Sequence, residues 1–235
     1  YENYFHEEGY FAAAVFYKSL KDWQLEVPSL VDTSALTPPN GEPVAPLGVM
    51  TSWQNLGDGD IQGAEFTLSL SGGMFSDALD GFGGIFSATF LDSSIEFALD
   101  VPTDTAGGIE KREFDITVPG LSDEVYNATV YYEKAGFEFR VSWRSRSDFL
   151  GEVSGLSLSR VPVQVLGSDL VDAQISYDFS ESGIEALYGL TLTLQGQNLT
   201  DEAFVTAHKA DGNGQDVRDA QVFGRNFMLG LNYKF

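Results

Sequence analysis

Charged side chains on alternate positions of one segment are the residues best suited to contact a ligand. After a turn at residues 133–136, every second position is charged or polar, and the positions between are apolar, as in Phe137, Phe139 and Trp143. Because successive side chains of a β-strand point to opposite faces, the charges share one face. They could pair with one another or contact a polar ligand. The charged row consists of Glu138, Arg140, Arg144, Arg146 and Asp148.

The sequence contains no motif for catalysis or for a bound cofactor. A GxSxG nucleophile elbow, an HExxH zinc site and a phosphate-binding loop are all absent. Without cysteine, the chain has no disulfide framework, thiolate metal site or cysteine nucleophile. Its two histidines, His6 and His208, lie far apart in sequence and do not indicate a metal or haem site. The sequence therefore predicts no enzymatic activity and no cofactor.

One segment has oxygen-bearing side chains of the kind that bind calcium. They lie between residues 211 and 216, and the candidate ligands are Asp211, Asn213 and Asp216. A calcium-binding EF-hand loop also needs an acidic residue at its twelfth position, which this segment lacks. A polar, glycine-rich loop is therefore the simpler interpretation, and no metal site is predicted.

The chain is strongly acidic. It has 35 acidic and 13 basic side chains and a formal net charge of −22 at pH 7. Such a chain repels phosphate backbones, so nucleic-acid partners are not expected. Two interpretations of the acidity stay open. It keeps the protein soluble, or it lies on outer loops that meet divalent cations beside a lipopolysaccharide headgroup layer.

Alternation of apolar and polar residues with period two dominates the chain, and helical periodicity is almost absent. No apolar run approaches the roughly 18–20 residues of a membrane helix. Several alternating segments are close to or longer than the roughly 9–11 residues that cross a bilayer as a tilted strand. Nine strands are predicted, at residues 1–5, 9–24, 51–71, 82–96, 118–133, 136–150, 169–180, 188–199 and 217–235.

The connections between these strands alternate between short and long. In chain order they are residues 6–8, 25–50, 72–81, 97–117, 134–135, 151–168, 181–187 and 200–216. Short periplasmic turns and long outer loops alternate in this way in antiparallel outer-membrane β-barrels. Since the last strand follows a long loop, its C-terminus is predicted to lie in the periplasm. A soluble β-sandwich is the alternative, but its links need not alternate and its strands average only about 5–6 residues.

Four segments resemble TonB-dependent receptors of the outer membrane. The ending GRNFMLGLNYKF, at 224–235, resembles the terminus of that family, where the last strand closes the barrel and ends in an aromatic residue. The segment GDGDIQGAEFTLSL, at 57–70, is similar to a family strand in which glycine precedes an acidic residue and an apolar run. NLTDEAF, at 198–204, resembles the stretch where the penultimate strand enters the last outer loop. Residues 119–150 resemble a hairpin of the branch typified by Xanthomonas and Caulobacter receptors.

This resemblance implies a barrel of about 22 strands plugged by an N-terminal domain. Residues 1–235 would be the C-terminal portion of that barrel, and the plug would lie outside this chain. The implied function is substrate-specific import energised by TonB, and the branch points to an oligosaccharide or similar nutrient. A ferric siderophore is the rival ligand, while a passive porin-like barrel and a soluble lectin-like β-sandwich are rival functions. The implied partners are the TonB complex, reached through the plug, the barrel-assembly machinery, outer-membrane lipid and a small nutrient ligand.

The predicted outer mouth carries the candidate substrate contacts. Trp23 and Trp53 flank the first long loop, and their rings could stack on the apolar faces of sugars. Anchoring at the membrane interface is the alternative role for both. In the charged row, Arg144 and Arg146 lie nearest the predicted outer mouth and are further candidates. The whole row, with Glu138, Arg140 and Asp148, is predicted to line the lumen, and a salt-bridge ladder against the plug is the alternative for all five residues.

The last predicted strand carries an apolar residue at every second position. The resemblance implies that these residues form a signal read by the barrel-assembly machinery. They are Phe227, Leu229, Leu231, Tyr233 and Phe235. The same count places Arg225 on the lipid face, where a charge at mid-bilayer costs about 2–4 kcal/mol. The sequence therefore predicts that Arg225 reaches back to the interface or that a bulge turns it inward.

Overall fold

The computed structural model describes residues 1–5, 9–36, 40–42, 45–102, 109–154, 161–209 and 215–234. Within these residues the regular structure is antiparallel β-sheet together with four single-turn 3₁₀ helices. No described helix is long and apolar enough to cross a membrane. The predicted all-β, antiparallel fold class is confirmed.

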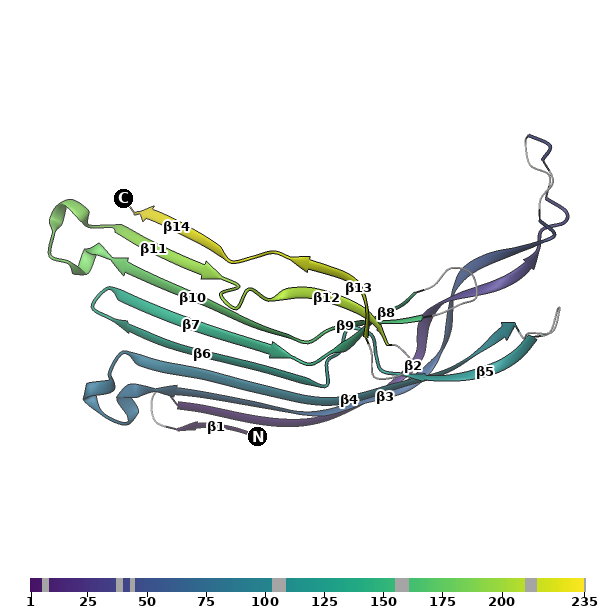
Figure 1. Cartoon of the computed structure of the whole chain (residues 1–235). Helices are drawn as coiled ribbons and strands as arrows, with labels where there is room; N and C mark the ends of the chain where they lie inside the picture. The colour runs from purple at the N-terminus through teal and green to yellow at the C-terminus, as the bar shows by residue number, and fades with distance from the viewer. Residues whose placement is uncertain are drawn as a thin grey trace.

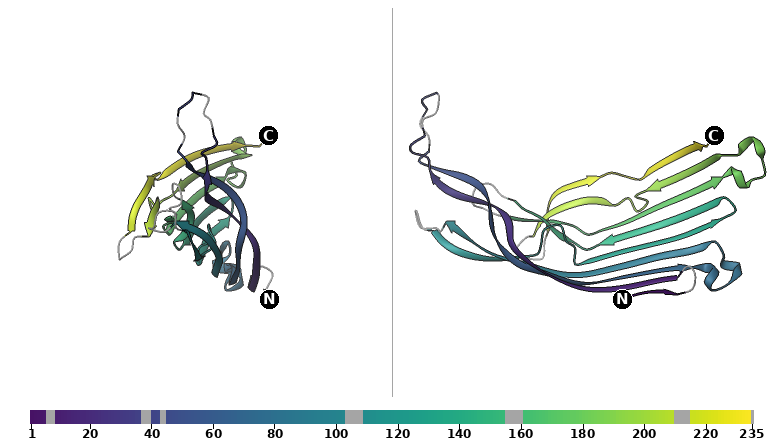
Figure 2. Two further views of the ribbon diagram at one scale, coloured as in Figure 1. Left: turned by 90° about the vertical axis from the view of Figure 1, so that its right-hand side faces the viewer. Right: turned by 180° about the vertical axis from the view of Figure 1, so that it is seen from behind.

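One large sheet follows the order of the chain (Figure 1). Each strand pairs with the next along the path, which ends on β1 and β14, so the sheet is open within the described residues. The sheet is curved and twisted (Figure 2). Its path is β1 (Glu2–Phe5), β2 (Gly9–Asp32), β3 (Leu47–Ser71), β4 (Phe82–Pro102), β6 (Glu124–Lys134), β7 (Phe137–Arg146), β10 (Ser168–Asp178), β11 (Leu190–Gln197) and β14 (Asn226–Tyr233).

The nine predicted strands correspond to these nine strands of the path, although their ends differ. The first two long connections are largely hairpins rather than irregular loops. β2 and β3 stay paired as far as Asp32 and Leu47. The predicted loop at 97–117 contains β5 (Ile109–Ile116), which pairs with the far end of β4. The predicted boundary at residue 24 was wrong because a bulge near Asp22, whose φ is 54°, interrupts the alternation while pairing continues.

The other two long connections combine into a second sheet, which we call the outer sheet. β8 (Phe149–Ser154) and β9 (Val161–Val165) come from one connection. β12 (Ala203–Lys209) and β13 (Gln215–Val222) come from the other. The order is β13-β12-β9-β8, and β9 pairs with β12 across the two connections. The predicted last strand at 217–235 is therefore two strands that belong to different sheets.

Arg225 lies in the break between β13 and β14. Gly224 has a φ of 73° there, and the alternation of β14 begins only at Asn226. The Arg225 Nε–H donates to the Leu199 carbonyl oxygen at 2.9 Å. The count that placed Arg225 on the lipid face does not hold, because β14 begins after it. That Arg225 reaches the interface or turns inward stays a prediction.

Tight turns gather at the other end of the sheet. β6 and β7 are joined by Ala135 and Gly136, whose φ values of 52° and 78° suit a two-residue hairpin turn. Lys134 forms an ion pair with Asp80 at 2.9 Å, which links two neighbouring turns and holds the pKa of the Asp80 carboxyl below its usual range. The longer turns hold η1 (Gly72–Met74), η2 (Asp77–Leu79), η3 (Phe179–Glu181) and η4 (Glu185–Leu187).

Strand register determines which side chains share a face. Val141 lies opposite Val130 on β6 and Ala173 on β10, and this apolar row continues onto the other strands. Many side chains on this face are exposed, including Val15 at 85% and Leu229 at 72%. A β-sandwich would bury such a face against a second sheet, so the sandwich alternative was wrong.

The buried core is small and lies where the hairpins leave the main sheet. Val27, Ile95, Phe97 and Val118 are buried together, and Ile95 is completely inaccessible. The buried Ser93 hydroxyl accepts the Val118 N–H at 3.1 Å. The core therefore fixes the long β2–β3 and β4–β5 hairpins to the segment that precedes β6.

Candidate functional site

An outer row of aromatic rings crosses four strands on the apolar face. Phe66, Phe90, Tyr126 and Trp143 come from β3, β4, β6 and β7, and neighbouring ring centroids are 6.4, 5.7 and 6.4 Å apart. The indole Nε1–H of Trp143 donates to Asp169 Oδ1 at 3.1 Å. One end of the tryptophan is thus apolar and the other polar, as at a membrane interface. We call these four rings the outer belt.

Beyond the outer belt, the same face becomes polar. Two residues past Phe90, Asp92 accepts a hydrogen bond from Gln62 at 3.3 Å. Two residues past Tyr126, Glu124 accepts one from the Tyr126 hydroxyl at 2.9 Å. The outer belt therefore coincides with the edge of the apolar surface.

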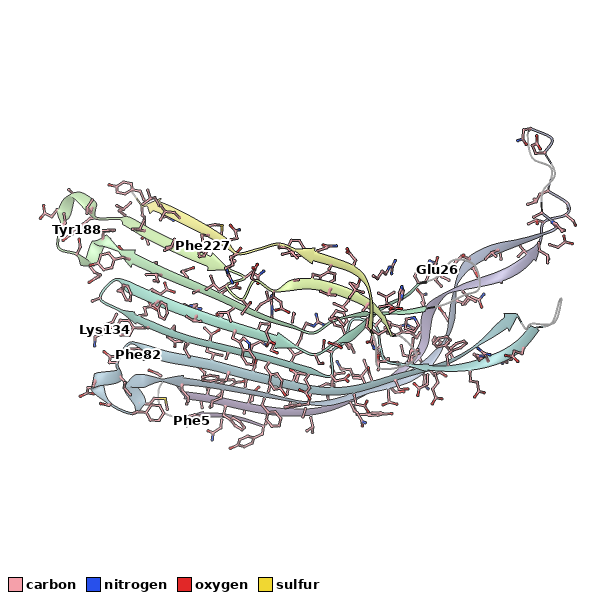
Figure 3. The ribbon with its side chains drawn as sticks, viewed as in Figure 1. Phe5, Glu26, Phe82, Lys134, Tyr188 and Phe227 are labelled. Atoms are coloured by element: carbon pink, nitrogen blue, oxygen red, sulfur yellow. The ribbon has the colours of Figure 1, made fainter. Side chains whose placement is uncertain are left out.

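An inner row of rings lies near the turns. Phe82 and Tyr132 have centroids 4.6 Å apart, and Tyr132 and Phe137 have centroids 6.0 Å apart. Figure 3 shows Phe82 and Lys134 at this end and Glu26 on the far extension of β2. The three rings, which we call the inner belt, are followed by the charged pair Lys134 and Asp80.

The face between the two belts is apolar. On β7 the belts are six residues apart, from Phe137 to Trp143, which is about 20 Å along a strand. That spacing is comparable with the apolar band of an outer-membrane barrel, about 25 Å tall and flanked by aromatic girdles. Representative side chains between the belts are Leu68, Phe86, Ala128, Val130, Phe139, Val141, Ile175, Leu194, Leu229 and Leu231.

The opposite face carries the charged row of β7. Register places Glu138, Arg140, Arg144 and Arg146 on this face, away from Phe137, Phe139, Val141 and Trp143. Near the turns, Arg140 Nε lies 3.6 Å from Glu138 Oε1. The Ser176 hydroxyl donates to the other oxygen of Glu138 at 3.2 Å. Arg140 also lies over the Tyr131 ring at 5.6 Å. This half of the row is therefore internally paired.

The outer half of the row differs because it has no carboxylate partner in the part of the chain that the structure describes. Among the described residues, neither Arg144 nor Arg146 forms an ion pair. Arg146 Nε–H donates to the Ser122 hydroxyl at 2.9 Å, and a terminal N–H donates to the Gly120 carbonyl oxygen at 3.3 Å. Its guanidinium lies 3.8 Å from the centre of the Phe149 ring. Arg146 is thus held in place by neutral groups.

Both arginines line a pocket where the charged face of the main sheet meets the outer sheet. The pocket has a volume of about 530 Å³. Its remaining lining residues are Val125, Phe149, Val165, Leu166, Ser168, Leu170, Ala203 and Phe204. We call it the arginine pocket. The outer-sheet residues that complete it were not predicted as site residues from the sequence.

Asp148 lies outside β7, in the corner that leads to the outer sheet. Its Oδ1 accepts the Gly167 N–H at 2.6 Å. It therefore joins the two ends of the connection that carries β8 and β9, and it does not continue the charged row along β7. The predicted strand at 136–150 extended too far because Phe149 and Leu150 begin β8.

The two candidate tryptophans are not brought together. Trp23 packs against the buried core around Ile95. Trp53 is 70% exposed and pairs with Glu26, so it lies on the opposite face of the hairpin from the buried Val27. A shared sugar-stacking platform does not form from this pair.

The structure describes only some of the candidate calcium ligands and of the apolar residues at the end of the chain. Asp211 and Asn213 lie outside the described residues, and Asp216 is exposed on β13. In the described part of the chain, no group of acidic or histidine residues could hold a metal ion. On β14, Phe227, Leu229, Leu231 and Tyr233 continue the apolar face beside β11. Phe235 lies outside the described residues.

Comparison with known proteins identifies one family. A family model described as TonB dependent receptor-like, beta-barrel, matches residues 1–199. The match includes every main-sheet strand from β1 to β11 and both aromatic belts. No curated protein and no solved structure matches the chain.

Proposed function

The chain belongs to the TonB dependent receptor-like β-barrel family, and we propose that it forms part of the wall of a substrate-specific outer-membrane importer. The family membership supports transport across the outer membrane with energy supplied through TonB. In this proposal the strands of residues 1–235 are the C-terminal part of a larger barrel. A plug encoded elsewhere in the receptor contacts the TonB complex.

One observation carries the membrane assignment. The apolar face is continuous from β2 to β14, and on β4, β6 and β7 it is bounded by both aromatic belts, with charged groups beyond each. Neither edge strand can remain unpaired in lipid, because unsatisfied backbone groups are costly there. We therefore infer that further strands pair with β1 and β14. The turns would face the periplasm and the outer sheet the cell exterior, and the C-terminus would then lie in the periplasm.

The proposed substrate is a small nutrient, and an oligosaccharide is the first candidate because of the branch resemblance in residues 119–150. A ferric siderophore is the second. A passive porin would have the same wall but would need no energy input. The interior face supports a solute path in every case, because it carries the paired residues Glu138 and Arg140 and the amides Gln174 and Gln195.

Dependence on TonB distinguishes active import from passive diffusion. Cells with the full-length receptor should grow on an oligosaccharide, or acquire iron from a siderophore, within a defined panel of both. Growth on the responding compound should be lost when TonB is deleted and should return on complementation. Growth that persists without TonB would identify a passive barrel.

The face assignment predicts a difference in chemical accessibility. Val130 is 47% exposed on the apolar face, while Asn127 on the same strand is exposed on the charged face. In a full-length receptor without other reactive thiols, Asn127→Cys should react with a polar maleimide in intact outer membranes. Val130→Cys should react only with a lipid-soluble reagent, because lipid excludes the polar one. Both variants should react with the polar maleimide after unfolding. Faster reaction of this reagent with residue 130 than with residue 127 in intact membranes would contradict the face assignment.

A further inference from the structure

The arginine pocket is unusual for its charge. The whole chain has 35 acidic side chains against 13 basic ones. The described lining of the pocket nevertheless contains two arginines and no acidic residue. The positive charges of Arg144 and Arg146 also repel each other. Two cations brought together on an acidic chain, with no carboxylate among the described residues beside them, provide a local site for an anion.

The other lining residues indicate the chemistry of the part of the ligand that carries the anionic group. Phe149, Leu170 and Phe204 contribute rings and an aliphatic side chain, and Val125 and Val165 add further apolar surface. Ligand pockets typically have volumes of about 300–1,000 Å³, and this pocket has about 530 Å³. Its volume and lining suit a group of a few rings rather than a single inorganic ion.

The two arginines differ in how firmly their guanidinium groups are held. Arg146 is fixed by Ser122, Gly120 and Phe149. Arg144 is exposed and has no hydrogen-bond or ion-pair partner among the described residues. A fixed guanidinium and a free one can together donate hydrogen bonds to a pair of anionic oxygens, since guanidinium donors match carboxylate and phosphate geometry.

We propose that the arginine pocket binds an organic anion, a carboxylate or phosphate carried on an apolar or ring-bearing body. Arg144 and Arg146 contact the anionic group, and Phe149 and Phe204 contact the body. The pocket's role in uptake rests on the proposed import function, and it favours an acidic substrate over a neutral sugar. Arg140 lies on the same face, four residues before Arg144 along β7, and takes no part because Glu138 neutralises it.

The test measures binding to the purified full-length receptor in detergent. The probes are 2-naphthoate and its neutral analogue 2-naphthamide, and titration calorimetry gives both dissociation constants. The receptor should bind the anion at least about tenfold more tightly than the amide, as expected for a charge-assisted contact. Arg144→Gln should remove about the same factor. The matched variant Arg140→Gln should bind 2-naphthoate as the unchanged receptor does.

Three results would overturn the proposal. They are equal binding of the two probes, unchanged binding in Arg144→Gln, and absence of 2-naphthoate binding. The last would show that the two arginines do not bind an aromatic carboxylate. Because binding is measured without TonB, failure of TonB-dependent uptake would contradict the proposed function and leave this result standing. Uptake of neutral compounds alone, together with no anion preference, would contradict only the pocket assignment.

Discussion

Leu194→Arg is expected to destabilise the folded barrel severely. Leu194 lies between Ile175 and Leu229 on the apolar face and is 48% exposed. An arginine on the lipid face near the bilayer midplane costs about 2–4 kcal/mol. Since 1.4 kcal/mol changes an equilibrium about tenfold, the folded-to-unfolded ratio should fall roughly 30-fold to 1,000-fold. Urea-dependent folding of the full-length receptor into lipid vesicles, followed by gel mobility without heating, measures the change.

Thr193→Arg is the matched control on the adjacent residue. Thr193 points to the opposite face, between Ser176 and Gly230. The small partner Gly230 leaves space, since a Cβ placed there would lie 3.8 Å from Thr193 Cβ. Thr193→Arg should therefore fold at nearly the same urea concentration as the unchanged receptor. If the two variants are equally destabilised, the apolar face does not meet lipid.

The succession of main-sheet strands could be predicted because each strand pairs with the next in the chain. In that arrangement local alternation and one turn determine each pairing. The hairpin of β6 and β7 is the clearest example, since the turn at Ala135 and Gly136 sets the register of all ten residues of β7. The two faces of β7 follow from that register and match the predicted division between Phe139 and Arg140.

The outer sheet could not be predicted because its central pairing is not local. β9 and β12 are short, β9 contains Pro162, and their pairing joins Val163 to His208. Nothing in either segment's own alternation identifies the other. The arginine pocket depends on this pairing, so the sequence identified Arg144 and Arg146 but not Phe204, which comes from β12.

Backbone irregularities explain the other errors. The bulge beside Asp22 and Trp23 breaks the period while leaving the β2–β3 pairing intact, so the predicted strand ended eight residues before Asp32. It also places Trp23 in the core, away from Trp53. At Gly224 the predicted strand was too long rather than too short. Apolar residues lie on both sides of this glycine, so the sequence pattern resembles that of one long strand. In both places the residue types indicated a strand, but not where its regular geometry changed.

Polar replacement of the aromatic pair at the end of the chain is expected to reduce assembly more than stability. Tyr233 lies beside Leu190 at the turn end of β14 and is 52% exposed. Even a charge near the membrane interface costs only about 0–1 kcal/mol, which is small beside a folding stability of about 5–15 kcal/mol.

Tyr233→Ser combined with Phe235→Ser should nevertheless lower the amount of folded receptor at the cell surface about tenfold, a change that a stability loss of about 1 kcal/mol cannot produce in a protein stable by about 5–15 kcal/mol. The reason is that β14 must be recognised and held until its free edge pairs, and its regular apolar face is the template. Heat-modifiable receptor in outer-membrane fractions measures the effect. The matched control is Tyr177→Ser, at the same end of β10, a strand that is paired on both sides. It should change this amount little. Equal losses at both sites would show that the terminus is ordinary barrel wall, and unchanged levels in the double variant would contradict the assembly role directly.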